Sequence, residues 1–241
     1  MIRVQDVHKS FGKQKVLQGL SFEVQEGQSL VIMGPSGSGK SVILKHLIGL
    51  LRPNSGLVEV AGQEVPRLRP QGLAELRREM GYLFQHAALI NWLSVYDNVA
   101  LPLRETTSRS EAEIETKVLD VLERVKMVDA RNKKPSEISG GMQKRVGLAR
   151  ALVTDPRIIL YDEPEAGLDP EMSASVSAMM LELRQELGMT SVTVTHSWHC
   201  AEAVGDRVAF FEHGQLVIDA PPAEVMASDI PRVREFFATP K

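Results

Sequence analysis

This sequence lacks a second cysteine, a large excess of charge of one sign, and an apolar run long enough to cross a membrane. The single cysteine, Cys200, excludes an internal disulfide and fits a reducing compartment. The net charge of -3 provides no basic field, which argues against nucleic acid as the main partner. No apolar stretch approaches the roughly 18 residues that a membrane-spanning helix needs. A function at a membrane would therefore depend on partner proteins.

The remaining composition is that of an ordinary globular protein. Hydrophobic residues make up 43% and charged residues 24% of the 241 positions, far from the composition of a disordered chain. The length allows one well-buried domain with a small insert. The first residues, Met1 to Asp6, predict a strand rather than a signal peptide.

The hydrophobic pattern changes along the chain in a way typical of an α/β fold. Residues 16–24 alternate like a half-buried strand, and residues 29–33 form a continuous apolar strand followed by a helix over 41–50. Residues 67–127 favour helices, with a capping box at Ser110 and Glu113. Strands over 157–162 and 190–195 flank a helix over 170–187, and two short helices split near Pro231 end the chain. This alternation predicts a parallel sheet covered by helices.

A glycine-rich turn, Gly34-Pro35-Ser36-Gly37-Ser38-Gly39-Lys40-Ser41, lies between the apolar strand and its helix. It fits the pattern G-x-x-x-x-G-K-[ST] in the strand–turn–helix context that the motif requires. The backbone amides of residues 36–41 would hold the phosphates, Lys40 would reach the β- and γ-phosphates, and the Ser41 hydroxyl would ligate Mg²⁺. We refer to residues 34–41 as the phosphate loop and predict that it binds a nucleoside triphosphate.

Two adjacent carboxylates follow a second apolar strand, Ile158 to Tyr161. Asp162 and Glu163 lie at the carboxyl end of this strand, where open α/β sheets bind ligands. Successive strand residues point in opposite directions, so the two have different roles. Asp162 suits Mg²⁺ coordination, and Glu163 suits deprotonation of the attacking water.

A second glycine turn, Ser139-Gly140-Gly141, also begins a predicted helix and forms another anion site. We call these three residues the signature turn. Together with Gln85, Gly167-Leu168-Asp169 and His196, in this order, the motifs resemble the nucleotide-binding domain of ATP-binding-cassette (ABC) proteins over essentially the whole chain.

The resemblance implies a role for each of these positions. Gln85 would form the Q-loop, residues 138–143 the signature motif, Asp169 the end of the D-loop, His196 the switch histidine, and Phe11 the aromatic platform for adenine. The candidate residues are, for catalysis, Lys40, Gln85, Glu163 and His196; for nucleotide binding, Phe11, Gly34, Pro35, Ser36, Gly37, Ser38, Gly39, Lys40, Ser41, Val42, Ser139, Gly140, Gly141 and Asp169; and for Mg²⁺, Ser41, Gln85 and Asp162.

The resemblance also implies a fold and a domain layout. We expect an α/β P-loop NTPase core with a parallel sheet flanked by helices, an N-terminal antiparallel β subdomain and an inserted α-helical subdomain. The expected boundaries within the single domain 1–241 are 1–85 and 155–220 for the RecA-like core with the β subdomain, 86–154 for the helical subdomain, and 221–241 for a helical tail.

Three details resemble a narrower group, the ATPase subunits of MCE/Mla-type (toluene-tolerance) lipid transporters. Val42 replaces the usual threonine after the phosphate loop, Met142 replaces the usual glutamine after the signature turn, and the segment 227–237 resembles the tail of that group. Ser197 follows His196 where aspartate is usual, and Ile138 replaces leucine.

From these resemblances we expect an ATPase that uses ATP and Mg²⁺, works as a head-to-tail homodimer, and powers phospholipid transport. Its partners would be an integral membrane permease and an MCE-domain substrate-binding protein, without nucleic acid, at the cytoplasmic face of the inner membrane. The apolar loop 86–93 would contact the permease. The alternatives are another ABC importer, a cell-division complex, or a soluble ABC ATPase.

His196, His199 and Cys200 share a helical spacing that a metal site can use. We found no convincing fourth ligand in the sequence and favour a structural role for His199 and Cys200.

Overall fold

The computed structural model describes residues 1–238, so residues 239–241 of the predicted tail lie outside the described part. The chain divides into two compact units, residues 1–76 with 190 onward, and residues 77–189. The predicted helical subdomain, 86–154, lies within the second unit.

The first unit contains an antiparallel sheet in the order β2-β1-β4-β5. Its strands are β1 (Ile2–Phe11), β2 (Gln14–Val24), β4 (Ser55–Val60) and β5 (Gln63–Glu64). Along β2 the side chains alternate toward its carboxyl end, with Leu20, Phe22 and Val24 buried and Ser21 and Glu23 exposed. This alternation is typical of a strand with one face on the core.

The first unit also contains strands in the order β10-β9-β3-β8. They are β3 (Ser29–Met33), β8 (Thr190–Val194), β9 (Arg207–Glu212) and β10 (Gln215–Ala220). β3 pairs in parallel with β8 and with β9, whereas β10 returns antiparallel to β9. Every residue of β3 and β8 is buried, as expected for parallel strands covered on both faces.

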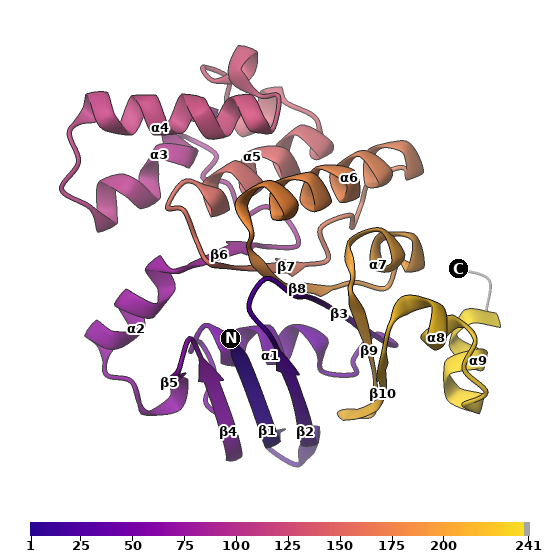
Figure 1. Cartoon of the computed structure of the whole chain (residues 1–241). Helices are drawn as coiled ribbons and strands as arrows, with labels where there is room; N and C mark the ends of the chain where they lie inside the picture. The colour runs from indigo at the N-terminus through magenta and orange to yellow at the C-terminus, as the bar shows by residue number, and fades with distance from the viewer. Residues whose placement is uncertain (239–241) are drawn as a thin grey trace. The chain divides into compact units, whose positions relative to one another are not determined.

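Helices cover these strands (Figure 1). α1 (Lys40–Leu47) packs against β4 and β8, and α7 (Trp198–Val204) packs against β3. The two short helices predicted for the tail are confirmed as α8 (Pro222–Met226) and α9 (Pro231–Ala238). A 3-10 turn, Val65–Arg67, precedes α2 (Pro70–Arg78). The last two residues of α2 belong to the second unit, which begins at Arg77.

The second unit combines two parallel strands with four long helices. The strands are β6 (Met80–Leu83) and β7 (Ile158–Asp162); the helices are α3 (Val95–Thr106), α4 (Glu111–Arg124), α5 (Gly140–Leu152) and α6 (Pro170–Leu187), with 3-10 turns at Val128–Ala130 and Pro135–Glu137. In Figure 1 the four helices gather above β6 and β7. The predicted capping box is confirmed: Ser110 Oγ accepts a hydrogen bond from the Glu113 amide, and the Glu113 carboxylate accepts one from the Ser110 amide at 2.8 Å.

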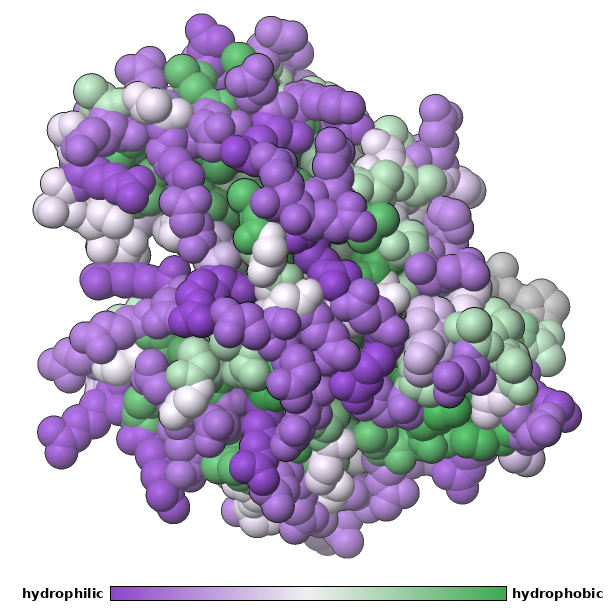
Figure 2. Space-filling view, viewed as in Figure 1, coloured by the Kyte–Doolittle hydropathy of each residue, from purple (hydrophilic) through white to green (hydrophobic). Residues whose placement is uncertain are grey.

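The predicted fold class is confirmed, with two local differences. β6 lies inside the stretch that we interpreted as helical, because four residues are too few to reveal a strand by periodicity. The β9–β10 hairpin had no counterpart in our prediction. Hydrophilic side chains dominate the face shown in Figure 2, in keeping with the burial of the apolar residues in the core.

Candidate nucleotide-binding site

The phosphate loop requires its glycines for two physical reasons. Gly34 has a φ of +145°, and a Cβ there would lie 2.0 Å from the Phe211 carbonyl oxygen. Gly39, with a φ of +97°, begins α1, and a Cβ would lie 2.9 Å from Leu17 Cδ2. Larger residues would therefore clash with neighbouring strands. The loop is held in its curved form by close packing.

The start of α1 leaves its positive end available to an anion. The helix has neither a side-chain cap nor an acidic residue in its first turn, whereas α4 begins with a capping box and two glutamates. Lys40 is 7% exposed, and its Nζ donates to the Gly34 and Pro35 carbonyls at 2.8 and 2.9 Å. Ser38 Oγ is buried without a hydrogen-bond partner in residues 1–238. A buried ammonium and an unsatisfied hydroxyl beside glycine amides fit a phosphate group.

Two further candidates of the first unit lie on the surface. Phe11, at the end of β1, is 47% exposed, and the Lys9 ammonium lies 5.2 Å from the centre of its ring. His196 is exposed just beyond β8.

The residues after His196 have structural roles in α7. Ser197, which departs from the common pattern, caps α7 by accepting a hydrogen bond from the Cys200 amide at 3.2 Å. Cys200 is fully buried while His199 is exposed, which agrees with a structural role for the cysteine.

In the second unit, β7 ends with the two predicted carboxylates. Asp162 is 8% exposed and accepts a hydrogen bond from the Tyr82 hydroxyl at 3.2 Å. Burial, and then the neighbouring Asp162 carboxylate, raise the pKa of Tyr82 far above its ordinary value, so this hydroxyl remains a donor. A buried carboxylate offers Mg²⁺ the hard oxygen ligand that it prefers, and the Ser41 hydroxyl is of the same kind.

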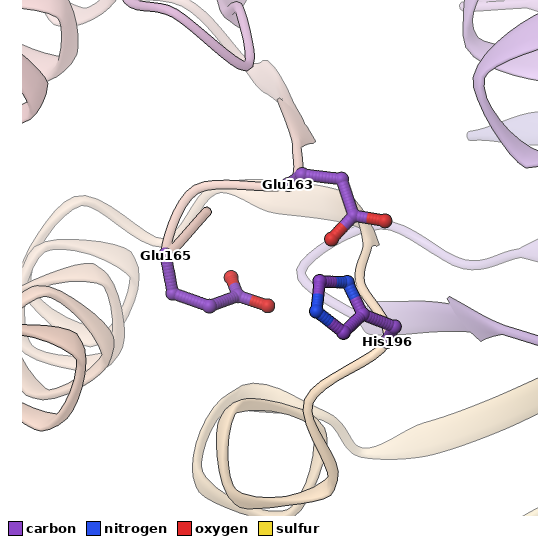
Figure 3. Close-up of side chains that lie close together, drawn as sticks. All are labelled: Glu163, Glu165 and His196. Carbon is purple, nitrogen blue, oxygen red and sulfur yellow. The ribbon is translucent and has the colours of Figure 1, made fainter. Parts of the chain in front are cut away.

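Glu163 adopts a left-handed backbone conformation, with a φ of +50°. A non-glycine residue in this region costs about 1–3 kcal/mol and is often found at functional sites. Figure 3 shows the Glu163 and Glu165 side chains extending from the same turn after β7, and their nearest carboxylate oxygens are within 4.8 Å of each other. The figure also draws His196, which belongs to the first unit.

One buried cation of the second unit was missed by sequence reasoning. Lys144, on α5, is 5% exposed, and its Nζ donates to the carbonyl oxygens of Gln85 and of Glu163, the latter at 3.1 Å. Burial lowers the pKa of Lys144, and the carboxylates of Glu165, Glu163 and Asp162 act in the opposite direction. The ammonium thus joins two predicted site residues through their backbone.

The signature turn begins α5. Ser139 caps the helix by accepting a hydrogen bond from the Met142 amide at 3.3 Å, and no acidic residue follows in the first turn. Ser139 and Gly140 are exposed. A Cβ on Gly140 would meet its nearest atom, Leu168 Cδ2, only at 3.9 Å, which is ordinary contact. The fold of this chain therefore does not require a glycine at position 140.

The remaining candidates have well-defined positions. The Gln85 side chain is exposed beyond β6. Asp169 caps α6, with its Oδ1 accepting a hydrogen bond from the Met172 amide at 2.9 Å. In the first unit, the structure thus gathers the residues of the phosphate loop around the Lys40 ammonium. In the second unit, it brings Gln85 and Glu163 together at Lys144.

Comparisons with known proteins agree with these features. Residues 17–166 match the family model described as ABC transporter. Among curated proteins, the chain is 42% identical to the "Probable ribonucleotide transport ATP-binding protein mkl" of Mycobacterium leprae over 98% of its own length and 68% of that protein's. It is 38% identical to the arginine transport ATP-binding protein ArtM of Bacillus subtilis, covering 100% of this chain and 95% of ArtM. It is 37% identical to the methionine import ATP-binding protein MetN of Clostridioides difficile, covering 98% and 74%.

Among solved structures, the chain resembles the cassette MJ0796, a dimer in a post-hydrolysis state bound to ADP and Pi. The TM-score is 0.85 at 32% identity, with 92% of this chain and 99% of that chain covered.

The fold and the two glycine turns thus define a nucleotide-binding protein of the P-loop class. The chain belongs to the ABC transporter family, and it is an ABC ATPase that binds and hydrolyses ATP. No helix in residues 1–238 combines the length and the apolar character needed to span a membrane.

Proposed function

We propose that two copies of this chain bind ATP head to tail and that the signature turn of each copy completes the site on the other. Gly140 carries the proposal. It is exposed at the start of α5, whose first turn has no acidic residue, and nothing in its own chain excludes a side chain there. A glycine that is not required within the chain fits close approach of a group from outside it. The γ-phosphate held by the partner's phosphate loop is such a group.

We assign the steps of hydrolysis to the following side chains. Lys40 and the amides of the phosphate loop hold the phosphates and offset their charge. Mg²⁺, for which Ser41, Asp162 and Gln85 are the candidate ligands, would stabilise negative charge on the phosphate oxygens when bound. Glu163 accepts the proton of the attacking water, and His196 hydrogen-bonds to the γ-phosphate. Phe11 stacks on adenine, and Asp169 lies at the dimer interface.

The test of this function is ATP-dependent dimerisation of Glu163→Gln. The amide keeps the size of the side chain and removes its basicity, so ATP persists and the closed dimer accumulates. Light scattering coupled to gel filtration measures the mass with and without Mg-ATP. A protein that stays monomeric at saturating Mg-ATP, while binding it, contradicts the proposal.

We further propose that the loop after Gln85 contacts a membrane permease and that the protein resides at the cytoplasmic face of the inner membrane through this contact. Trp92 of this loop is 78% exposed, and Phe84, directly before Gln85, is 39% exposed, which is unusual for large apolar side chains. Trp92→Glu should abolish transport while leaving the basal ATPase rate of the isolated subunit unchanged. A Trp92→Glu subunit that still forms the complex as the wild type does would contradict this contact.

For the transported substrate we propose a phospholipid, with an MCE-domain protein as the substrate-binding partner. The support is residue resemblance at Val42, Met142 and segment 227–237. The names of the relatives instead favour ribonucleotides, methionine or arginine as a second candidate class of substrate. Copurification of the intact membrane complex distinguishes the two. An MCE-domain partner supports lipid transport, and a solute-binding protein for amino acids or nucleotides contradicts it.

A further inference from the structure

We infer that Lys144 is a positioning residue for ATP hydrolysis, because its buried ammonium ties the backbone of Glu163 to the backbone of Gln85. The inference rests on the proposed role of Glu163 as the base. Lys144 would not touch substrate itself.

The strand ends explain why one side chain reaches both carbonyls. β6 and β7 pair in parallel, with Leu83 opposite Tyr161, so the residues beyond them leave the same end of the pair. Gln85 follows β6 by two residues, and Glu163 directly follows β7. An ammonium has three donors and no acceptor, so it can bind two carbonyl oxygens at once.

Two glycines bring α5 close enough for this contact. A Cβ on Gly147 would lie 2.8 Å from Leu83 Cδ1, and a Cβ on Gly81 would lie 2.4 Å from the Ala151 carbonyl oxygen. Positions 144, 147 and 151 share one face of the helix. The close approach of α5 to β6 thus places Lys144 over the ends of both strands.

A second cation of α5 binds the same loop. Arg150 donates to the carbonyl oxygens of Ala87 and Ala88 at 2.6 and 2.8 Å, and both alanines have positive φ. Lys144 and Arg150, both on α5, therefore bind three carbonyl oxygens of the loop after β6, those of Gln85, Ala87 and Ala88. Only Lys144 of these two cations also binds the Glu163 backbone.

This arrangement gives Lys144 a specific effect on Glu163. The left-handed backbone at Glu163 is a costly conformation that surrounding contacts must maintain. Replacing the ammonium by an apolar group leaves the Gln85 and Glu163 carbonyls without that donor, and the Glu163 carboxylate shifts from its place. A displacement of a reacting group by about 1 Å can cost about a hundredfold in rate.

The experiment compares Lys144→Met, which keeps most of the length but removes the charge and the donors, with Lys144→Arg, which keeps the charge and the donors. We expect kcat to fall by about ten- to a hundredfold in Lys144→Met, with the KM for ATP changed by less than about threefold, and Lys144→Arg to recover most of kcat. Lys117→Met is the matched control, because Lys117 lies on α4, outside the site, and pairs with Asp155 at 2.6 Å. If the methionine variant does not fold, Lys144→Gln replaces it, because glutamine removes the charge and its donors reach one atom less far than Nζ of lysine.

A second measurement tests whether Lys144 acts through Glu163. In the Glu163→Gln background, adding Lys144→Met should cause little further loss, because the group that it positions is already disabled. Equal kcat values for Lys144→Met and wild type, with Glu163→Gln inactive, overturn the inference alone. Undiminished turnover in Glu163→Gln overturns the proposed role of Glu163 instead. A full additional loss in the double variant also overturns the inference.

Discussion

Gly140→Ala separates what the chain needs in order to fold from what its dimer needs in order to work. Gly140 is the first residue of α5, its φ is outside the left-handed region, and an added Cβ makes only ordinary contact with Leu168 at 3.9 Å. Alanine favours a helix over glycine by up to about 1 kcal/mol. The melting temperature should therefore stay unchanged or rise by a few degrees, about 2–4 °C.

The same methyl group should harm hydrolysis. It would occupy the exposed surface where we place the partner's γ-phosphate, and keeping that phosphate at a distance weakens the charge stabilisation that the turn provides. We expect kcat/KM to fall by at least about tenfold, or about 1.4 kcal/mol in activation free energy. ATP-dependent dimerisation in the Glu163→Gln background should weaken in parallel.

Thermal unfolding, steady-state ATPase assays and light scattering measure these effects. Gly147→Ala is the contrasting variant, because its Cβ would lie 2.8 Å from Leu83 Cδ1 inside the α5–β6 interface and should lower the melting temperature. Wild-type turnover and dimerisation in Gly140→Ala would refute our reasoning about the signature turn.

Three other outcomes are expected. Lys40→Ala should weaken ATP binding by about tenfold or more in equilibrium titrations, because the ammonium–phosphate interaction is lost; unchanged affinity would contradict the role of the loop. Ser110→Ala removes the capping box of α4 and should lower the free energy of unfolding by about 1 kcal/mol without changing the ATPase rate. His46 is buried, which lowers its pKa from 6.5, so protonation of the unfolded chain should reduce stability as pH falls below 6.5, by up to about 1.4 kcal/mol per pH unit. Denaturant unfolding of His46→Gln should show a weaker pH dependence.

The sequence predicted the elements that have long or fully apolar patterns. The buried strands that carry the phosphate loop and Asp162 were recognised because parallel strands covered on both faces are apolar throughout. The capping box at Ser110 and Glu113 is a local signal and needs no tertiary information. Short or edge elements gave weaker signals. β6 has four residues, and residues of the β9–β10 hairpin did not stand out by alternation.

The role of Lys144 could not be predicted from the sequence. A lysine two residues after Met142 looks like an exposed helix residue, and only the tertiary packing at Gly147 and Gly81 shows that its side chain points at two strand ends. The close spacing of lysine and glycine on one face of α5 was the only available signal. The positive φ of Glu163 likewise depends on contacts from distant segments.

The most direct test of the head-to-tail dimer mixes two inactive variants, Lys40→Ala and Gly140→Asp. In a mixed dimer, the intact phosphate loop of the Gly140→Asp chain faces the intact signature turn of the Lys40→Ala chain, so one site is restored. We predict that an equal mixture recovers roughly a quarter of the wild-type ATPase rate, because about half of the dimers are mixed and each has one intact site of two. A mixture as inactive as either variant alone would contradict a site shared between two chains.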